Sequence, residues 1–486
     1  MLLAACSCGR GEKITRVPVI PAPSDVELYN GPFCEDPGNI RFKEKPSLGE
    51  DAYTLKIGRK GVTITAGSQS GAFWGMQTLR QMTESLEALP TGVINDCPRY
   101  SWRGFMLDEA RHFSGKERVK LILDEMARLK LNRFHWHLTD AQGWRIEIKK
   151  YPRLTVIGST GSHSDPDSPS VYYTQDDIRE IVDYAAERNI TVIPEIDMPG
   201  HAGAACRSYP EYAGGDWFGF TFNPGKEETY SFLTDILREV AGLFPGKWLH
   251  IGGDEVSYGS EAWMENPDVK ALMEREGLEG VKEVESYFMH RMADSVKVLG
   301  KTLVCWDDAF DVGLGAEDQV IMWWRHDRAD KLRSIAENKC PAVLCPRRPL
   351  YFDFIQDSTH RVGREWDGFN TLDDVYGFPE NRYSRWELSD EELGEVLGLQ
   401  ANMWTETMQD KARVDYMLFP RIAALAEAAW CIPLSKDYEH FCRVLEREYE
   451  RYESMGLYYF DYRDPSAHPE PQGPTVIPQK PINYFK

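Results

Sequence analysis

Apolar and polar positions between residues 100 and 430 alternate between two patterns. Short apolar runs typical of buried strands are separated by stretches with the apolar spacing of amphipathic helices. The strand-like runs are RGFMLDE from residue 103, RFHWHLTD from 133, TVIPEID from 191, WLHIGGDE from 248, KTLVCWDD from 301, QVIMWWR from 319, PAVLCP from 341 and VLGLQANMW from 396. Helices are predicted at 116–130, 175–188, 282–298 and 411–429. Eight strand–helix units in about 330 residues predict a (β/α)8 TIM barrel, although residues 347–394 resemble a loop more than a helix.

A smaller unit precedes this repeating pattern. Residues 53–67 alternate like two strands joined by a glycine-containing turn, and residues 68–86 follow with helical spacing after a serine cap. These features predict a small α+β domain in front of the barrel. The predicted plan is a signal remnant or lipoprotein linker at 1–17, the small domain at 18–96, the barrel at 97–435, and a C-terminal helix and tail at 436–486.

The first residues, MLLAACSCGRGE, contain a pattern of their own. Leu3-Ala4-Ala5-Cys6 resembles a bacterial lipobox, in which the cysteine is lipidated, although the basic region and the longer apolar core of a signal peptide are missing. No segment approaches the roughly 20 apolar residues of a membrane-spanning helix. We therefore expect membrane contact only through a lipid anchor at Cys6, and a bacterial cell-envelope (periplasmic or surface) or secreted location.

Composition narrows the class of partner. The net charge of −21 disfavours nucleic acid and anionic membrane surfaces. Aromatic residues make up 12% of the chain, and flat sugar faces stack on such rings, which favours carbohydrate. The ten cysteines include no CxxC pair, which argues against a zinc site of that kind. We expect neither a metal nor another cofactor.

Acidic residues follow the predicted strands, at the rim where TIM barrels build their active sites. They include Asp108, Asp140, Asp197, Asp254, Glu255, Asp307 and Glu406. Neighbouring side chains on a regular strand point to opposite faces. Gly252 and Gly253 permit a break in the fourth strand, so that Asp254 and Glu255 face one space. This arrangement predicts a site that uses two carboxyl groups together.

Five motifs resemble, in order and spacing, those of family-20 glycoside hydrolases, the β-N-acetylhexosaminidases. They are RGFMLDEARHF, HWHLTDAQGWR, PEIDMPGH, HIGGDEV and ANMWTE, and the resemblance extends from about residue 55 to about residue 430. It implies an exo-acting, retaining enzyme that releases terminal β-linked GlcNAc or GalNAc from a glycan or glycoconjugate. The sugar's own 2-acetamido oxygen is then the nucleophile, and the intermediate is an oxazolinium ion.

The resemblance also implies roles for individual residues. Glu255 is the acid and later the base, Asp254 polarises the acetamido group, and Tyr351 bonds its carbonyl oxygen. Arg111, Asp353 and Glu406 hold sugar hydroxyls, and Asp140 with His201 supports Glu255. Trp306, Trp324 and Trp404 wall the acetamido methyl, and Trp366 stacks in the same site. Trp323 adjoins Trp324, and the sequence leaves open which of the two lies in the site.

Two other classes of function remain open at this point. His135 and His137 share one face of a strand, and with His201 and His250 they form the ligand set of a metal-dependent hydrolase. Sensitivity to chelators distinguishes that enzyme from a metal-free glycosidase. A carbohydrate-binding protein on an inactive barrel is expected to keep the tryptophans but lose Asp254 or Glu255, and both acids are present.

Overall fold

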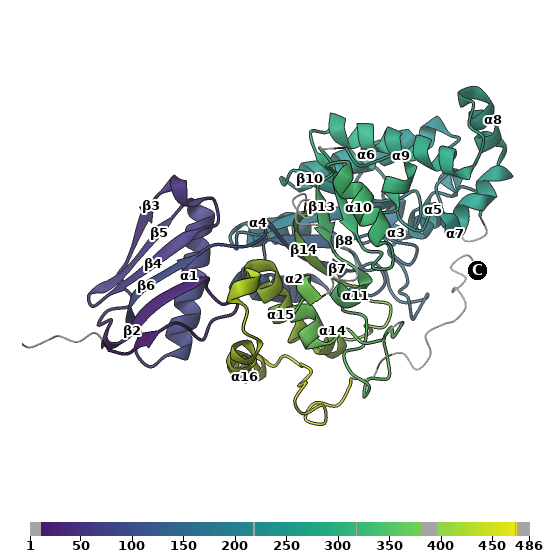
Figure 1. Cartoon of the computed structure of the whole chain (residues 1–486). Coiled ribbons are helices and arrows are strands. Elements are labelled where there is room, and N and C mark those ends of the chain that lie inside the picture. The colour runs from purple at the N-terminus through teal and green to yellow at the C-terminus, as the bar shows by residue number, and fades with distance from the viewer. Residues whose placement is uncertain are drawn as a thin grey trace, which may run out of the picture.

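A computed structural model describes residues 11–216, 219–316, 318–366, 368–381, 396–471 and 473. None of the helices in these ranges combines the length and the apolar composition that a bilayer-crossing segment needs. The predicted lipid attachment at Cys6 lies outside the described residues. Figure 1 shows a small sheet domain beside a larger barrel of strands surrounded by helices.

The barrel closes from eight parallel strands, which confirms the predicted fold class. The strands are β7 (Trp102–Asp108), β8 (Arg133–His137), β9 (Thr191–Met198), β10 (Trp248–Gly252), β11 (Thr302–Trp306), β12 (Val320–Trp323), β13 (Ala342–Leu344) and β14 (Val396–Met403). Closure occurs where β14 pairs with β7, from Gly398 opposite Trp102 to Met403 opposite Leu107. Because helices cover the outside and side chains fill the inside, every residue of β7 is buried. This burial on both faces explains the continuous apolar runs in the sequence.

Helices between the strands cover the outside of the barrel (Figure 1). The longer ones are α2 (Lys116–Arg128), α4 (Gln175–Ala186), α6 (Glu227–Leu243), α8 (Pro267–Glu276), α9 (Val281–Val298), α10 (Ala329–Glu337), α14 (Lys411–Leu418), α15 (Arg421–Trp430) and α16 (Tyr438–Met455). Shorter ones are α3 (Arg153–Val156), α5 (Gly203–Ser208), α7 (Ser257–Ser260), α11 (Arg347–Leu350) and α12 (Leu372–Tyr376). Helix α4 shows how the sequence specifies where a helix begins. The Thr174 hydroxyl accepts a hydrogen bond from the Asp177 N–H, and the Asp177 carboxylate accepts one from the Thr174 N–H.

The single helix predicted at 411–429 is wrong. Helix α14 ends at Leu418, and α15 begins at Arg421. Pro420 lies between them, and a proline inside a helix lacks the N–H that the helix needs and clashes with the preceding turn. Apolar spacing continues through both helices, so the pattern alone concealed the break.

The N-terminal domain is a six-stranded sheet in the order β1-β2-β6-β4-β5-β3, covered on one face by α1 (Gln69–Ser85). Its strands are β1 (Lys13–Ile14), β2 (Asp25–Phe33), β3 (Ile40–Glu44), β4 (Tyr53–Gly58), β5 (Gly61–Ala66) and β6 (Pro90–Asp96). The expected hairpin is β4–β5, and the expected serine cap is Ser68, which accepts from the N–H of Ser70. Strand β1 lies inside the segment predicted as linker and pairs with β2. The sequence did not reveal it, because two residues are too few to show an alternating pattern.

Helix α1 lies between the sheet and the barrel (Figure 1), and a buried cluster joins the two. The ring of Trp74 in α1 meets the ring of Trp430 in α15, with centroids 6.3 Å apart. Lys130 Nζ lies 3.0 Å from Asp96 Oδ2, and both side chains are fully buried. The small domain is therefore packed against the side of the barrel, away from the strand ends that carry the predicted acids.

Candidate active site

The backbone breaks at the two glycines where β10 ends, as the sequence predicts. Gly252 and Gly253 adopt φ values of 71° and 91°, which are left-handed conformations that favour glycine. A Cβ atom at Gly252 would lie 1.7 Å from Asp197 Oδ1, and one at Gly253 would lie 2.7 Å from Met289 Cε. Positive φ favours glycine at both positions, and at Gly252 a side chain would also collide with Asp197, whereas at Gly253 the nearest atom is the flexible end of Met289. The chain then turns so that Asp254 and Glu255 both reach the mouth of the barrel.

A half-open cavity lies at this rim, with about 500 Å³ of empty space when its opening to solvent is included. Its lining comes from segments that follow five different strands. The lining residues are Arg111, Asp254, Glu255, Trp324, Arg347, Tyr351, Phe354, Arg364, Trp366, Trp404 and Glu406. Eight of these are predicted site residues, and the other four predicted residues, Asp140, His201, Trp306 and Asp353, lie directly behind the lining.

His201 connects the two carboxyl groups of the cavity to a third. Its Nε2 lies 3.5 Å from Asp254 Oδ2 and 3.6 Å from Glu255 Oε2. Its Nδ1 lies 3.1 Å from Asp140 Oδ1. The structure thus places Asp140 and His201 behind the two acids, in the position expected of a supporting pair.

The two neighbouring acids have opposite pKa shifts. Burial raises the pKa of Asp254 to about 7, opposed by the charge of His201 and reinforced by that of Glu255. Burial also raises the pKa of Glu255, but the hydrogen bond and charge of His201 and the charge of Arg111 outweigh it, so the net shift is downward. Between the two pKa values, below about pH 7, the pair therefore holds a single proton.

Arg111 is held in place by acidic partners. Its Nη2 lies 2.7 Å from Asp140 Oδ2, and its Nε donates to Gln142 Oε1 at 3.0 Å. The ring of Trp404 lies under its guanidinium group, 5.0 Å from centroid to carbon. The charges of Arg111 and His201 hold the pKa of Asp140 well below its usual range, against the effect of burial. Arg111 thus reaches the cavity as a fixed cation.

The tryptophans occupy two different depths. Trp324 and Tyr351 stack nearly parallel in the cavity, with centroids 6.3 Å apart at 13°. Trp306 packs behind Trp404, with centroids 6.0 Å apart, and its Nε1 donates to Glu195 Oε1 at 2.8 Å. Trp323 is fully buried, and its Nε1 donates to the carbonyl of Arg328. Of the two adjacent tryptophans, Trp324 is therefore the one that reaches the cavity.

Arg364 is a cavity residue that sequence reasoning missed. Its Nε donates to Asp353 Oδ2 at 2.7 Å, and its Nη2 donates to Glu406 Oε1 at 2.6 Å. Its guanidinium group also lies over the ring of Trp366, at 4.7 Å. A lone arginine in a loop has no periodic pattern, and its proximity to Trp366 was the only available signal. Arg347 and Phe354 were missed for the same reason.

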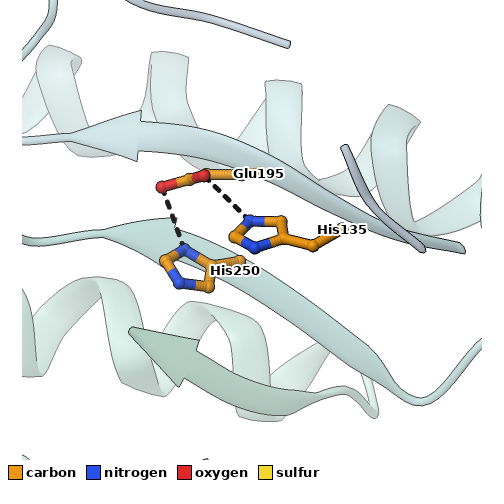
Figure 2. A group of neighbouring side chains, drawn as sticks. All are labelled: His135, Glu195 and His250. Carbon is orange, nitrogen blue, oxygen red and sulfur yellow. Dashed lines mark ion pairs between the residues drawn. The ribbon is translucent and has the colours of Figure 1, made fainter. Parts of the chain in front are cut away.

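The histidines of the metal-hydrolase alternative are divided among three groups of possible ligands in the described residues, two of which share Asp197. Figure 2 shows one group, in which His135 Nε2 and His250 Nδ1 lie 2.8 and 3.1 Å from the Glu195 carboxylate. Gln400 Nε2 donates to His135 Nδ1 at 3.0 Å. The proton of neutral His135 is therefore on Nε2, the nitrogen that faces Glu195. With its proton on Nε2, His135 has no lone pair to offer a metal ion on the Glu195 side, which argues against a metal centre in this group.

Comparison with known proteins agrees with this geometry. The model of glycosyl hydrolase family 20, catalytic domain, matches residues 100–432, and that of the family's domain 2 matches residues 29–97. The Beta-hexosaminidase of Porphyromonas gingivalis is 39% identical over 436 residues, which cover 85% of this chain and 55% of that protein. The Beta-hexosaminidase of Vibrio furnissii is 36% identical over 419 residues, covering 80% and 66%. This chain thus spans between about half and two thirds of the length of these two relatives.

A solved structure matches over most of its length as well. The GH20 exo β-N-acetylglucosaminidase from Vibrio harveyi, in complex with N-acetylglucosamine, has a TM-score of 0.83 and 30% sequence identity. The match covers 95% of this chain and 81% of that one. The family models match both domains, and the chain belongs to glycosyl hydrolase family 20.

Proposed function

We propose that this protein is an exo-acting, retaining β-N-acetylhexosaminidase that releases terminal β-linked GlcNAc or GalNAc from the non-reducing end of a glycan. The observation that carries the proposal is the pair Asp254 and Glu255, placed by two glycines at one cavity of a family-20 barrel. The names of the relatives support the same activity.

Buried acceptors of the site support a polar ligand of about one sugar. Asp254 Oδ1, Asp353 Oδ1 and Glu406 Oε2 are buried and have no hydrogen-bond partner within the described part of the chain. A buried carboxylate oxygen without a donor is costly. The acetamido N–H and the hydroxyls of a terminal N-acetylhexosamine supply such donors.

The chemistry follows from these positions. The acetamido oxygen attacks the anomeric carbon, and the bond from that carbon to the leaving oxygen breaks. Glu255 gives its proton to the leaving oxygen, and Asp254 accepts the acetamido N–H and balances the growing positive charge. Water then opens the oxazolinium ion from the face that the leaving group vacated, and Glu255 takes the water's proton. Two displacements at one carbon retain the configuration.

Substrate binding is expected to redistribute the single proton of the pair. In the free protein, the raised pKa of Asp254 and the lowered pKa of Glu255 place the proton on Asp254. A donor aimed at Asp254 favours its ionised form. An acetamido N–H therefore drives the proton toward Glu255, where the leaving oxygen needs it. This coupling restricts the active protonation state to sugars that carry the acetamido group.

The attacking atom can be identified with a fluorinated substrate series. Aryl glycosides whose N-acetyl group carries one, two or three fluorines should show kcat/KM falling steeply at each step, because fluorine depletes the attacking lone pair. A thiazoline mimic of the cyclic intermediate should inhibit strongly. A flat series together with turnover of plain β-glucosides would instead indicate an enzyme nucleophile and exclude the substrate-assisted mechanism.

Arg364 is expected to control substrate binding more than the chemical step. Replacing it with Leu removes charge-assisted bonds that hold Asp353 and Glu406, so KM should rise roughly 10- to 100-fold with a smaller change in kcat. Arg361→Leu, at an exposed position in the same loop, is the matched control and should change neither. A fall in kcat at unchanged KM would contradict the assignment.

The membrane attachment predicted from Cys6 stays a prediction. So does the cell-envelope or secreted location, because both depend on residues outside the described ranges.

A further inference from the structure

His137 lies between two carboxylates, one on each side of its ring. Its Nδ1 is 2.6 Å from Glu195 Oε2, toward the barrel interior. Its Nε2 is 3.1 Å from Asp140 Oδ2, toward the cavity. A neutral imidazole has only one N–H, so it can donate to only one of them. The geometry therefore fits an imidazolium ion that donates to both.

The contacts continue from Asp140 to the catalytic pair. Asp140 uses Oδ2 for His137 and Oδ1 for His201, whose Nδ1 lies 3.1 Å away. Hydrogen bonds between buried groups thus run Glu195–His137–Asp140–His201. The outer nitrogen of His201 then faces both acids of the cavity, Asp254 at 3.5 Å and the partly exposed Glu255 at 3.6 Å. Formal charge alternates along this hydrogen-bonded chain from carboxylate to imidazolium at each step.

Glu195 anchors the inner end of this chain. Figure 2 shows His135 and His250 meeting its carboxylate from neighbouring strands. Two hydrogen bonds hold this carboxylate: Trp306 Nε1 donates to Oε1 at 2.8 Å, and His137 Nδ1 bonds Oε2 at 2.6 Å. The bond to Trp306 therefore orients the carboxylate oxygen that His137 contacts.

We propose that His137 and Glu195 are positioning residues for the acid Glu255, on which they act through Asp140 and His201. This inference rests on the proposed function and extends it to residues that touch neither substrate nor reacting atoms. The positive charge of His137 holds the Asp140 carboxylate in place. Asp140 in turn orients His201 and stabilises its protonated form, and His201 faces Glu255.

Neighbouring charges are consistent with a protonated His137 and a neutral His135. Burial lowers the pKa of His137, but the charge of Glu195 and the bonds to Asp140 and Glu195 outweigh it, and the net shift is far upward. Burial instead lowers the pKa of His135 to about 4, so His135 is neutral. Other charged groups face the chain: Asp108 and Asp197 near His137, Asp197 and Asp254 near His201, and Arg111, Arg325 and Arg364 near Glu255.

His135 provides a matched control for His137. Both lie on β8, both are buried, and both contact Glu195 Oε2, at 2.8 and 2.6 Å. Only His137 continues to Asp140, since the second nitrogen of His135 accepts from Gln400 instead. His137→Gln therefore removes a charge on the path to Glu255, whereas His135→Gln removes a neutral donor beside it.

The experiment compares pH profiles of kcat/KM for wild type, His137→Gln and His135→Gln. Wild-type activity should fall above about pH 7, where the Asp254–Glu255 pair loses its proton. Loss of one positive charge in His137→Gln should move this fall upward by about half to one pH unit, as expected for a unit charge at an effective dielectric of about 20 or more. His135→Gln should leave this fall at the wild-type pH, even if it lowers the thermal stability as much as His137→Gln does.

Leaving groups give a second readout. His137→Gln should lose roughly 10- to 100-fold on alkyl glycosides, a loss typical of outer-shell partners at metal sites, and much less on aryl glycosides with acidic leaving groups. His135→Gln should keep the wild-type ratio. Identical pH profiles and ratios in the two variants would overturn the proposal.

A direct measurement covers the case in which His137→Gln does not fold. In ¹⁵N-histidine-labelled wild type at pH 8, with His135→Gln used for assignment, His137 should be doubly protonated and His135 neutral. A neutral His137 would overturn the proposal. A wild type without activity on β-N-acetylhexosaminides would refute the proposed function instead. The ¹⁵N spectrum would still show whether His137 is charged.

Discussion

Replacing Glu255 with Gln should lower kcat/KM on natural glycosides by roughly 10²- to 10⁴-fold, the usual contribution of general acid catalysis. Natural leaving groups are alcohols, which depart only when protonated. Aryl glycosides with acidic leaving groups need little or no proton and should lose far less. The measurement is a plot of rate against leaving-group pKa, which should be much steeper for the variant.

A surface control separates this effect from general damage. Glu261→Gln removes an exposed carboxyl six positions along the chain and should leave both substrate classes unchanged. Equal losses on alkyl and aryl substrates in Glu255→Gln would refute its assignment as the acid.

Replacing Asp254 with Asn should depress both substrate classes, by roughly 10²- to 10³-fold, as expected when one preorganised electrostatic partner of a transition state is lost. Formation of the oxazolinium ion itself is impaired, whatever the leaving group. The two variants are therefore told apart by their leaving-group plots, steep for Glu255→Gln and parallel to wild type for Asp254→Asn. Near-normal rates would remove Asp254 from the mechanism.

Thermal unfolding supplies the control for Asp254→Asn. The folded-state pKa of Asp254, about 7, lies above its unfolded value of roughly 3.9. The folded protein thus holds a proton that the unfolded chain has lost, and this group's contribution to stability decreases as pH rises from about 4 to 7. Asparagine carries no such charge, so the Tm of the variant at pH 8 should equal or exceed that of wild type. A lower Tm would attribute the activity loss to folding.

The barrel strands were predictable because their physical cause is local. Parallel strands buried on both faces must be apolar throughout, so each leaves a run that can be read without knowing its neighbours. Pro420 is also a local signal for the break between α14 and α15, but the apolar spacing continues on both sides of it and concealed the break. Similarly, Gly252 and Gly253 marked the break at the end of β10, because glycine is favoured where φ is positive.

The sequence by itself determined the fold class, the family motifs and the carboxyl pair at the rim. Only the tertiary structure decided which side chains surround that pair and in which charge state. Arg364 joins Asp353 to Glu406 across segments that lie apart in the chain, and side chains from three other strands contact Glu195. The physical reason is that burial, hydrogen bonds and neighbouring charges set a pKa, and all three depend on residues brought together only when the barrel closes.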